Sequence, residues 1–162
     1  MTPFAWLLGL FLPACGAVGA AGLPVPPPAD IARIERPATP NTTLAAPAGF
    51  APAPDIVTPL YPVPAERLYG TIRGVALAAP RTFLAAEYPD RLQLHFVARS
   101  AVLNFPDLVL VQVSAAGPDA SSLLIYSRSV YGRSDLGVNR KRVEAWLAAV
   151  NTKLPTPAKD QP

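Results

Sequence analysis

Apolar residues recur with helical spacing in the middle of the chain. Between Pro64 and Pro80 they repeat every three or four positions, while most charged residues fall on the other side. Proline suits the first turn of a helix, and it disfavours helical geometry in the residue before it. The pattern therefore predicts an amphipathic helix between these prolines, with a buried face made of Ala65, Leu68, Ile72, Val75, Ala76 and Ala79.

The pattern then changes to one typical of β-strands. Residues 92–99 alternate between apolar and other side chains, which predicts a half-buried strand whose polar side carries His95 and Arg99. Tyr88-Pro89-Asp90 predicts a turn between this strand and the one expected before it, at 82–87. A second loop is expected at 116–119. We expect about four antiparallel strands, the other three being 82–87, 108–113 and 123–126.

A second helical pattern lies near the C-terminus. Asn139 is well placed as its N-cap, and Pro155 ends it. Its apolar positions follow the i, i+3, i+4, i+7 rule, at Val143, Trp146, Leu147, Val150 and Leu154. The order of elements predicts a single small α+β domain over residues 57–154, in which an antiparallel sheet packs with two helices. Residues 155–162 are predicted to be a disordered tail.

The N-terminal head carries no charged side chain before Asp30. A short apolar block, Phe4 to Leu12, is followed by small residues, which is the shape of a secretory signal. Leu12-Pro13-Ala14-Cys15 resembles the lipobox of bacterial lipoproteins and predicts lipidation at Cys15, with residues 1–22 as a signal or anchor segment. Three alternatives stay open: cleavage after Ala20 or Ala21 to give a soluble exported protein, a single transmembrane helix over 4–25, or a buried cytosolic element.

Proline is concentrated behind this head. Of the 21 prolines in the chain, twelve lie between Pro24 and Pro64. Proline removes amide donors and favours extended polyproline geometry, so residues 23–56 are predicted to be a Pro/Ala-rich linker that works as a semi-rigid spacer. For Pro37 to Pro54, a coil lying on the surface of the domain is an equally good interpretation.

Composition excludes several classes of protein. One cysteine and one histidine exclude a disulfide framework, a thiolate zinc or iron–sulfur site and a His-rich metal site, and no cofactor is expected. The net charge of +3 and the pI near 9.3 would suit nucleic acid. The exported location and the lack of an RNA-binding aromatic motif argue against that partner.

The densest polar chemistry lies between the last strand and the last helix, in residues 127–142. This segment holds five Lys or Arg residues against one carboxylate. Free amides at a helix start, together with Arg side chains, make a good anion site. In the structural interpretation, which we favour because no phosphate-binding Gly fingerprint is present, Arg128 or Arg142 pairs with Asp135 or Asp107. The candidate residues for either role are Arg128, Ser134, Asp135, Gly137, Asn139, Arg140 and Arg142.

These residues also carry a family resemblance. The chain resembles the bacterial family catalogued as domain of unknown function 1499 over about residues 57–150. The resemblance is carried by Phe105-Pro106-Asp107, Ser127-Arg128, Gly132 and the run from Ser134 to Arg142. The resemblance implies a compact α+β domain, often exported or attached to a membrane, with no established activity. It adds Phe105 and Asp107 to the residues to be located.

We therefore expect a cell-envelope protein anchored on the periplasmic side of a membrane, with a non-catalytic binding or structural role at its surface. The expected partners are the membrane itself, through the N-terminal lipid or apolar segment, and an anionic lipid or an envelope protein. The alternative is a hydrolase-type enzyme that uses a cleft around Asp107, Arg128, Asp135 and Asn139. A lone strand histidine such as His95 is more often a surface or hydrogen-bonded residue than a general base.

Overall fold

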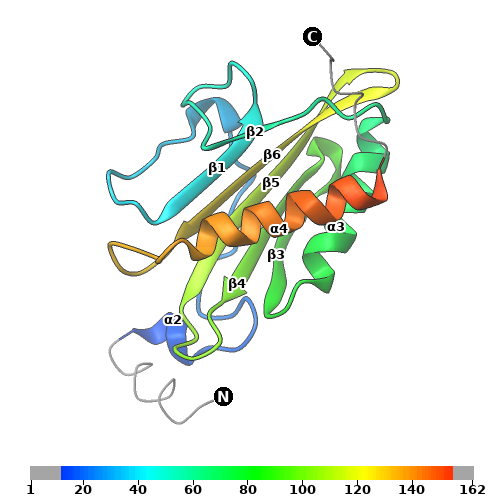
Figure 1. The fold of residues 1–162 in the computed structure, drawn as a ribbon. Helices are drawn as coiled ribbons and strands as arrows, with labels where there is room; N and C mark the ends of the chain where they lie inside the picture. Colours follow the sequence, from blue (N-terminus) through cyan, green and yellow to red (C-terminus); the bar gives the residue numbers. More distant parts are fainter. Residues whose placement is uncertain (1–11, 155–162) are drawn as a thin grey trace.

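A computed structural model describes residues 12–154 and shows one α+β domain built on a mixed six-stranded sheet (Figure 1). The strands lie in the order β2-β1-β6-β5-β4-β3. β1 and β2 pair in parallel, and every other neighbouring pair is antiparallel. The strands are β1 Thr42–Pro47, β2 Ile56–Thr58, β3 Thr82–Tyr88, β4 Gln93–Arg99, β5 Pro106–Gly117 and β6 Ala120–Ser129.

The prediction of about four antiparallel strands is thus corrected to six strands in a mixed sheet. The two additional strands come from the stretch assigned to the linker and from its boundary. β1 forms because Pro40 and Pro47 lie at its ends, so the amides between them are free to pair with β6 over Thr42–Ala45. The other predicted strands are present, with β5 and β6 longer than expected and joined by a tight hairpin at 118–119.

Two long helices cover one face of the sheet: α3 Ala65–Ala78 and α4 Val138–Lys153 (Figure 1). The limits of α3 confirm the helix predicted between Pro64 and Pro80. Short helical turns occur at α2 Pro13–Gly16, η1 Ile31–Arg33 and η2 Pro89–Arg91, the last at the predicted turn. The main core fills the space between the sheet and the long helices, where the rings of Phe96 and Trp146 meet edge to face with centroids 5.7 Å apart.

The prediction that Asn139 caps α4 is wrong. Gly137 occupies the N-cap with a φ of 78°, a left-handed conformation that glycine adopts without steric cost. Asp135 does the capping, because its carboxylate accepts the backbone N–H of Gly137 at 3.0 Å and that of Asn139 at 2.7 Å. Asn139 itself lies inside the first turn and is fully buried.

The opposite face of the sheet is covered by the N-terminal segment. β4 is therefore buried along its whole length, and the prediction of a half-buried strand with His95 and Arg99 on an open polar side is wrong. Gln93 makes two hydrogen bonds to Ala29, accepting its N–H at 2.7 Å and donating to its carbonyl at 3.0 Å. The Tyr88 hydroxyl donates to the carbonyl of Pro26 at 2.6 Å. Part of the predicted linker thus lies against the sheet.

Within residues 12–154, no helix is long and apolar enough to cross a membrane. Two parts of the predicted organisation lie outside the described residues. These are the start of the predicted signal or anchor segment, residues 1–11, and the predicted tail, residues 155–162.

Candidate functional site

The polar motif forms a closed hydrogen-bond network between the sheet and α4. Arg142 donates to the carboxylate of Asp107 at 2.6 Å, to the Ser127 hydroxyl at 2.9 Å and to the side-chain oxygen of Asn139 at 2.7 Å. Ser127 in turn donates to that same Asn139 oxygen at 2.5 Å. The side chains of Arg142 and Asp107 are only 12% and 8% exposed, so the ion pair is almost removed from water. We call these four residues the helix-face network.

Asn139 connects the helix-face network to the first strand. Its side-chain amide donates to the backbone carbonyl of Asn41, next to β1, and to the hydroxyl of Ser129 on β6, both at 3.0 Å. Asn41 extends the link by donating to the carbonyl of Gly132 at 2.7 Å. Asn139 therefore joins β1, β6 and α4, and its polar atoms are used within the fold.

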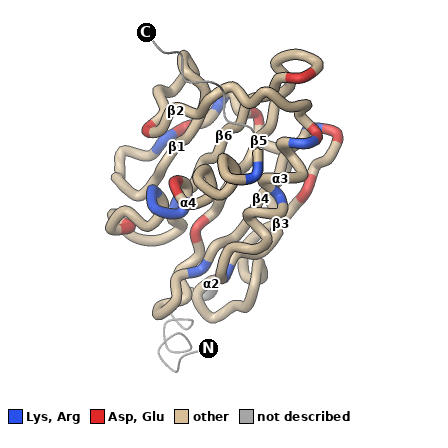
Figure 2. The backbone as a smooth tube through the Cα atoms, turned by 45° about the vertical axis from the view of Figure 1, so that its right-hand side comes forward, with Lys and Arg blue, Asp and Glu red and all other residues tan. Residues whose placement is uncertain are grey.

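The other candidate residues of the motif lie outside the helix-face network. Asp135 and Gly137 form the start of α4, and the Ser134 hydroxyl accepts the N–H of Leu136 at 3.3 Å. Arg140 pairs with Glu144 one turn further along α4, and both side chains are about half exposed. Phe105 packs against Tyr131, with ring centroids 6.3 Å apart. Figure 2 shows a run of Lys and Arg positions at the start of α4 and the others at separate places along the backbone.

Arg128 lies apart from the helix-face network. Successive side chains of a strand point to opposite faces, so Ser127 faces α4 and Arg128 faces the N-terminal segment. The backbone of Arg128 pairs with β1 and β5, but its side chain is exposed and makes no hydrogen bond or ion pair with residues 12–154. Asp107, Arg128, Asp135 and Asn139 do not share a cleft, because Arg128 is on the other side of the sheet.

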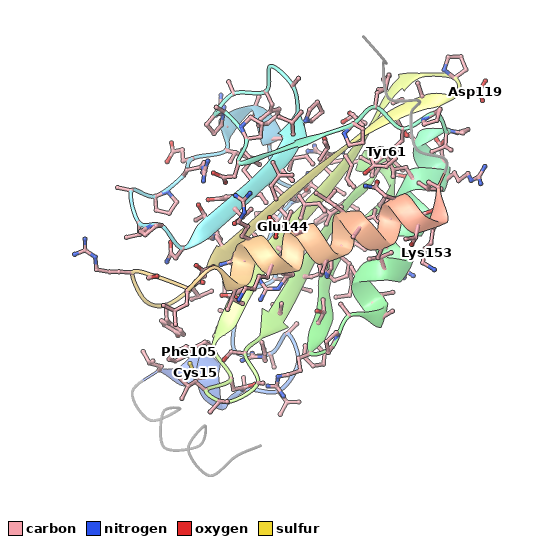
Figure 3. All side chains as sticks on the ribbon, in the orientation of Figure 1. Cys15, Tyr61, Phe105, Asp119, Glu144 and Lys153 are labelled. Atoms are coloured by element: carbon pink, nitrogen blue, oxygen red, sulfur yellow. The ribbon has the colours of Figure 1, made fainter. Side chains whose placement is uncertain are left out.

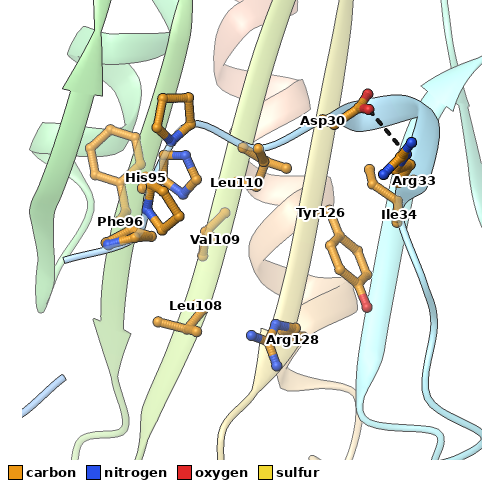
Figure 4. Close-up of a pocket in the computed structure, with 14 residues that line it drawn as sticks. Asp30, Arg33, Ile34, His95, Phe96, Leu108, Val109, Leu110, Tyr126 and Arg128 are labelled. Atoms are coloured by element: carbon orange, nitrogen blue, oxygen red, sulfur yellow. Dashed lines mark ion pairs between the residues drawn. The ribbon is translucent and has the colours of Figure 1, made fainter. Parts of the chain in front are cut away.

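Arg128 lines a cavity of about 390 Å³ between the sheet and residues 26–34 (Figure 4). On the floor, Leu108 and Leu110 of β5 lie between His95 of β4 and Tyr126 of β6, and the roof begins with three consecutive prolines. The lining residues are Pro26, Pro27, Pro28, Ala29, Asp30, Arg33, Ile34, His95, Phe96, Leu108, Val109, Leu110, Tyr126 and Arg128.

Two aromatic residues with ionisable groups border this cavity. Burial lowers the pKa of His95, whose Nε2 lies 3.0 Å from the side-chain oxygen of Gln93. Because an amide oxygen can only accept, Nε2 carries the proton of the neutral ring. Burial also raises the pKa of Tyr126, and its hydroxyl donates to the carbonyl of Glu35 at 3.2 Å. The sequence pattern missed this cavity, because its roof lies more than sixty residues before its floor.

A second cluster holds the residues around Cys15. The Arg99 guanidinium is buried and donates to the carbonyls of Ala14, Gly19 and Ala21 at 2.5 to 2.8 Å, as well as to that of Asn104 at 3.2 Å. The Asn104 amide donates to the carbonyls of Cys15 and Ala17. We call Arg99 and Asn104 the N-terminal clamp.

Cys15 itself is fully buried at the end of the molecule where Phe105 also lies (Figure 3). Burial raises the pKa of its thiol, and the nearby charge of Arg99 lowers it by less. In the described part of the chain, no three His, Cys, Asp or Glu side chains are grouped so that they could hold a metal ion.

Comparison with known proteins identifies one family. The family profile described as "Protein of unknown function (DUF1499)" matches residues 34–150, which is well over half of the chain. The matched range contains all six strands, α3 and most of α4, and it begins earlier than the sequence motifs suggested. No curated protein matches the chain.

Proposed function

The chain belongs to the DUF1499 family, whose function is unknown, and from that premise we propose that it is a non-catalytic binding domain held at a membrane surface in the cell envelope. The observation that carries the proposal is the contrast between Arg128 and the helix-face network. Asp107, Ser127, Asn139 and Arg142 satisfy one another, whereas the Arg128 side chain makes no hydrogen bond or ion pair with residues 12–154 and stands at the edge of a cavity. The side chains of Arg133 and Lys141 are also exposed and unpaired among these residues, but neither lines the cavity. An exposed Arg without a partner suits recognition of an anionic group.

The hydrolase alternative receives no comparable support. It requires Asp107, Arg128, Asp135 and Asn139 in one cleft, but Arg128 lies on the opposite face of the sheet from Asn139. Asp107 is paired with Arg142, and the Asp135 carboxylate accepts two backbone N–H groups. A group already bound in this way is poorly placed to transfer a proton to a substrate.

The N-terminal sequence is what supports the proposed location. Residues 1–29 are free of charge, and Cys15 stands at the end of a lipobox-like segment. Cys15 is fully buried within α2, so cleavage before Cys15 and attachment of the lipid require this segment to open. The lipid would then hold the end of the domain that carries residues 100–105 toward the membrane on the periplasmic side. Val18 and Val102 are 70% and 66% exposed at this end, which is consistent with contact with lipid.

The location is tested by expressing the chain and its Cys15→Ser variant in a bacterium that is fed a labelled fatty acid. We expect label on the wild type only, and the wild type in the membrane fraction. A soluble, shortened chain without label would support cleavage after Ala20 or Ala21. An unprocessed chain without label would support a transmembrane helix or a cytosolic element. Either result would contradict the lipoprotein.

The binding role is tested by amide hydrogen exchange of the full chain in vesicles of phosphatidylcholine, with and without phosphatidylglycerol. We expect the anionic lipid to slow exchange around residues 26–34 and 126–128 in the wild type but not in Arg128→Ala. Arg67→Ala removes one exposed charge from the helix-covered face and is the matched control. Identical exchange in the two vesicles would contradict binding to anionic lipid.

A further inference from the structure

We propose that the cavity beneath residues 26–34 binds a single-chain amphipathic anion, with the chain on the sheet and the head group at Arg128. This inference rests on the proposed binding role at a membrane surface and names the ligand class for it. It concerns the interior of the cavity, whereas the proposed function requires only that the domain contact anionic lipid.

The size of the cavity favours one chain. Its volume of about 390 Å³ is near the lower end of the range of small-molecule sites, ~300–1,000 Å³. Such a space suits a single acyl chain better than the two chains of a membrane phospholipid. The extended segment crosses above β4, β5 and β6 and partly covers the space (Figure 4).

The lining favours an apolar chain. Leu108 and Leu110 alternate with Val109 along β5, and they lie on the cavity side of the strand. Above them, Pro26 to Pro28 have no backbone N–H groups, so the roof presents few donors that would be left unpaired against a hydrocarbon. An apolar chain can therefore enter without burying unsatisfied amides.

The charges favour one anionic head group. Figure 4 shows Arg128 at the same end of the cavity as Leu108, with Asp30 and Arg33 toward the other end. Asp30 and Arg33 lie 3.5 Å apart and offset each other. The buried ring of His95 donates to Gln93 and adds no charge when neutral. Arg128 therefore leaves the lining with one unbalanced positive charge, which a single carboxylate or phosphate head would complement.

The position of the site relative to the anchor supports a lipid-derived ligand. The segment that roofs the cavity continues toward Cys15, the proposed lipid attachment point, through residues held by the N-terminal clamp. Only a short stretch of chain therefore separates the cavity from the proposed membrane anchor. Single-chain amphiphiles are concentrated in membranes.

The test uses the full chain in phosphatidylcholine vesicles and a dodecanoate that carries a photoreactive diazirine. After illumination, mass spectrometry locates the label. We expect it on cavity residues, chiefly Leu108, Leu110 and Tyr126. Excess dodecanoate should remove this label, and dodecanol, which has the same chain without the charge, should compete about tenfold less well. Equal competition by the alcohol, or label elsewhere than in the cavity, would overturn the proposal.

Two variants test the parts separately. Arg128→Ala removes the cation, Leu108→Trp fills the space, and each should lower cavity labelling by about tenfold, whereas Arg67→Ala should not. Circular dichroism checks that each variant is folded, and the comparison of acid with alcohol needs no variant. Unchanged labelling in both folded cavity variants would overturn the proposal. If the cavity is not labelled but phosphatidylglycerol still slows amide exchange, the proposed ligand is refuted and the proposed function is not. If the cavity is labelled but phosphatidylglycerol does not slow exchange, the proposed function is refuted and the ligand is not.

Discussion

The two faces of the central sheet use polar residues in opposite ways. On the face covered by α4, Arg142, Asp107, Ser127 and Asn139 form a network whose polar atoms are hydrogen-bonded within the fold. On the face covered by the N-terminal segment, Arg128 is left without a polar partner among the described residues, above an apolar floor. The first face satisfies its polar side chains within the fold, whereas the second leaves one cation beside a cavity.

This difference shows why a dense polar motif is not by itself a binding site. Ser127 and Arg128 are adjacent in sequence, but the alternation of a strand sends them to opposite faces. The motif therefore divides into the hydrogen-bonded helix-face network and three exposed cations whose side chains make no hydrogen bond or ion pair among residues 12–154, namely Arg128, Arg133 and Lys141, of which Arg128 lines the cavity. The following predictions test that division in order of expected size.

Arg142→Ala should have the largest effect on stability. It leaves the carboxylate of Asp107, only 8% exposed, without its partner and also removes donors to Ser127 and Asn139. Breaking a buried ion pair from one side costs about 3–5 kcal/mol. Urea unfolding should show a loss of that size in the free energy of unfolding.

Arg140→Ala is the matched control for that measurement. Arg140 lies on the same helix and pairs with Glu144, but the two side chains are 54% and 49% exposed. Solvent screens such a pair, so the loss should stay below about 0.5 kcal/mol. Equal losses in the two variants would mean that the helix-face network does not stabilise the fold.

Arg99→Met should have a smaller, local effect on the other face. The variant removes the donor to three carbonyls of residues 14–21, but these carbonyls can return to water if the segment lifts away. We expect a global loss of about 1–2 kcal/mol and clearly faster amide exchange in residues 14–21. Arg91→Met, an exposed residue just before β4, should leave that exchange unchanged. Unchanged exchange in Arg99→Met would argue against the N-terminal clamp.

His95 should make the stability of the domain depend on pH. Because burial lowers its pKa in the folded state below the ordinary 6.5, the unfolded chain binds more protons once the pH falls below that value. The contribution of His95 is fully present above pH 6.5 and is lost as the pH falls toward the folded-state pKa. Glu87, whose pKa is lowered chiefly by its hydrogen bond from Arg73, follows the same sign but only below its ordinary 4.5.

Urea unfolding at about pH 7.5 and about pH 5.5 measures this effect. The wild type should lose stability between the two values, and His95→Gln, which keeps a side-chain donor without titrating, should lose less. The same loss in both proteins would show that His95 can take up a proton without disturbing the cavity.

The elements with a complete local signal could be predicted from the sequence. α3 has a regular apolar face between Pro64 and Pro80, and the hairpin of β5 and β6 has apolar runs on both sides of Gly117-Pro118. In the candidate site, the pairing of Arg142 with Asp107 was one of the alternatives that charge and spacing suggested.

The rest depended on contacts between distant parts of the chain. β1 is a short run within a proline-rich stretch, and its partner β6 lies about eighty residues later. Nothing local shows that residues 26–34 would cover His95 and Arg128, because that face of β4 has the alternation of a strand exposed to water. Asn139 looked like a helix cap by position, but its side chain is used to join β1 and β6.

The smallest expected effect gives the sharpest comparison, because it concerns adjacent residues. Arg128→Ala removes an exposed side chain without a polar partner among residues 12–154, so the free energy of unfolding should change by less than about 0.5 kcal/mol. Ser127→Ala removes a buried hydroxyl between Arg142 and Asn139 and should cost about 1–2 kcal/mol. Urea unfolding of both variants measures the difference. Comparable losses would show that Arg128 also supports the fold, and the cavity would then have no cation to spare for a ligand.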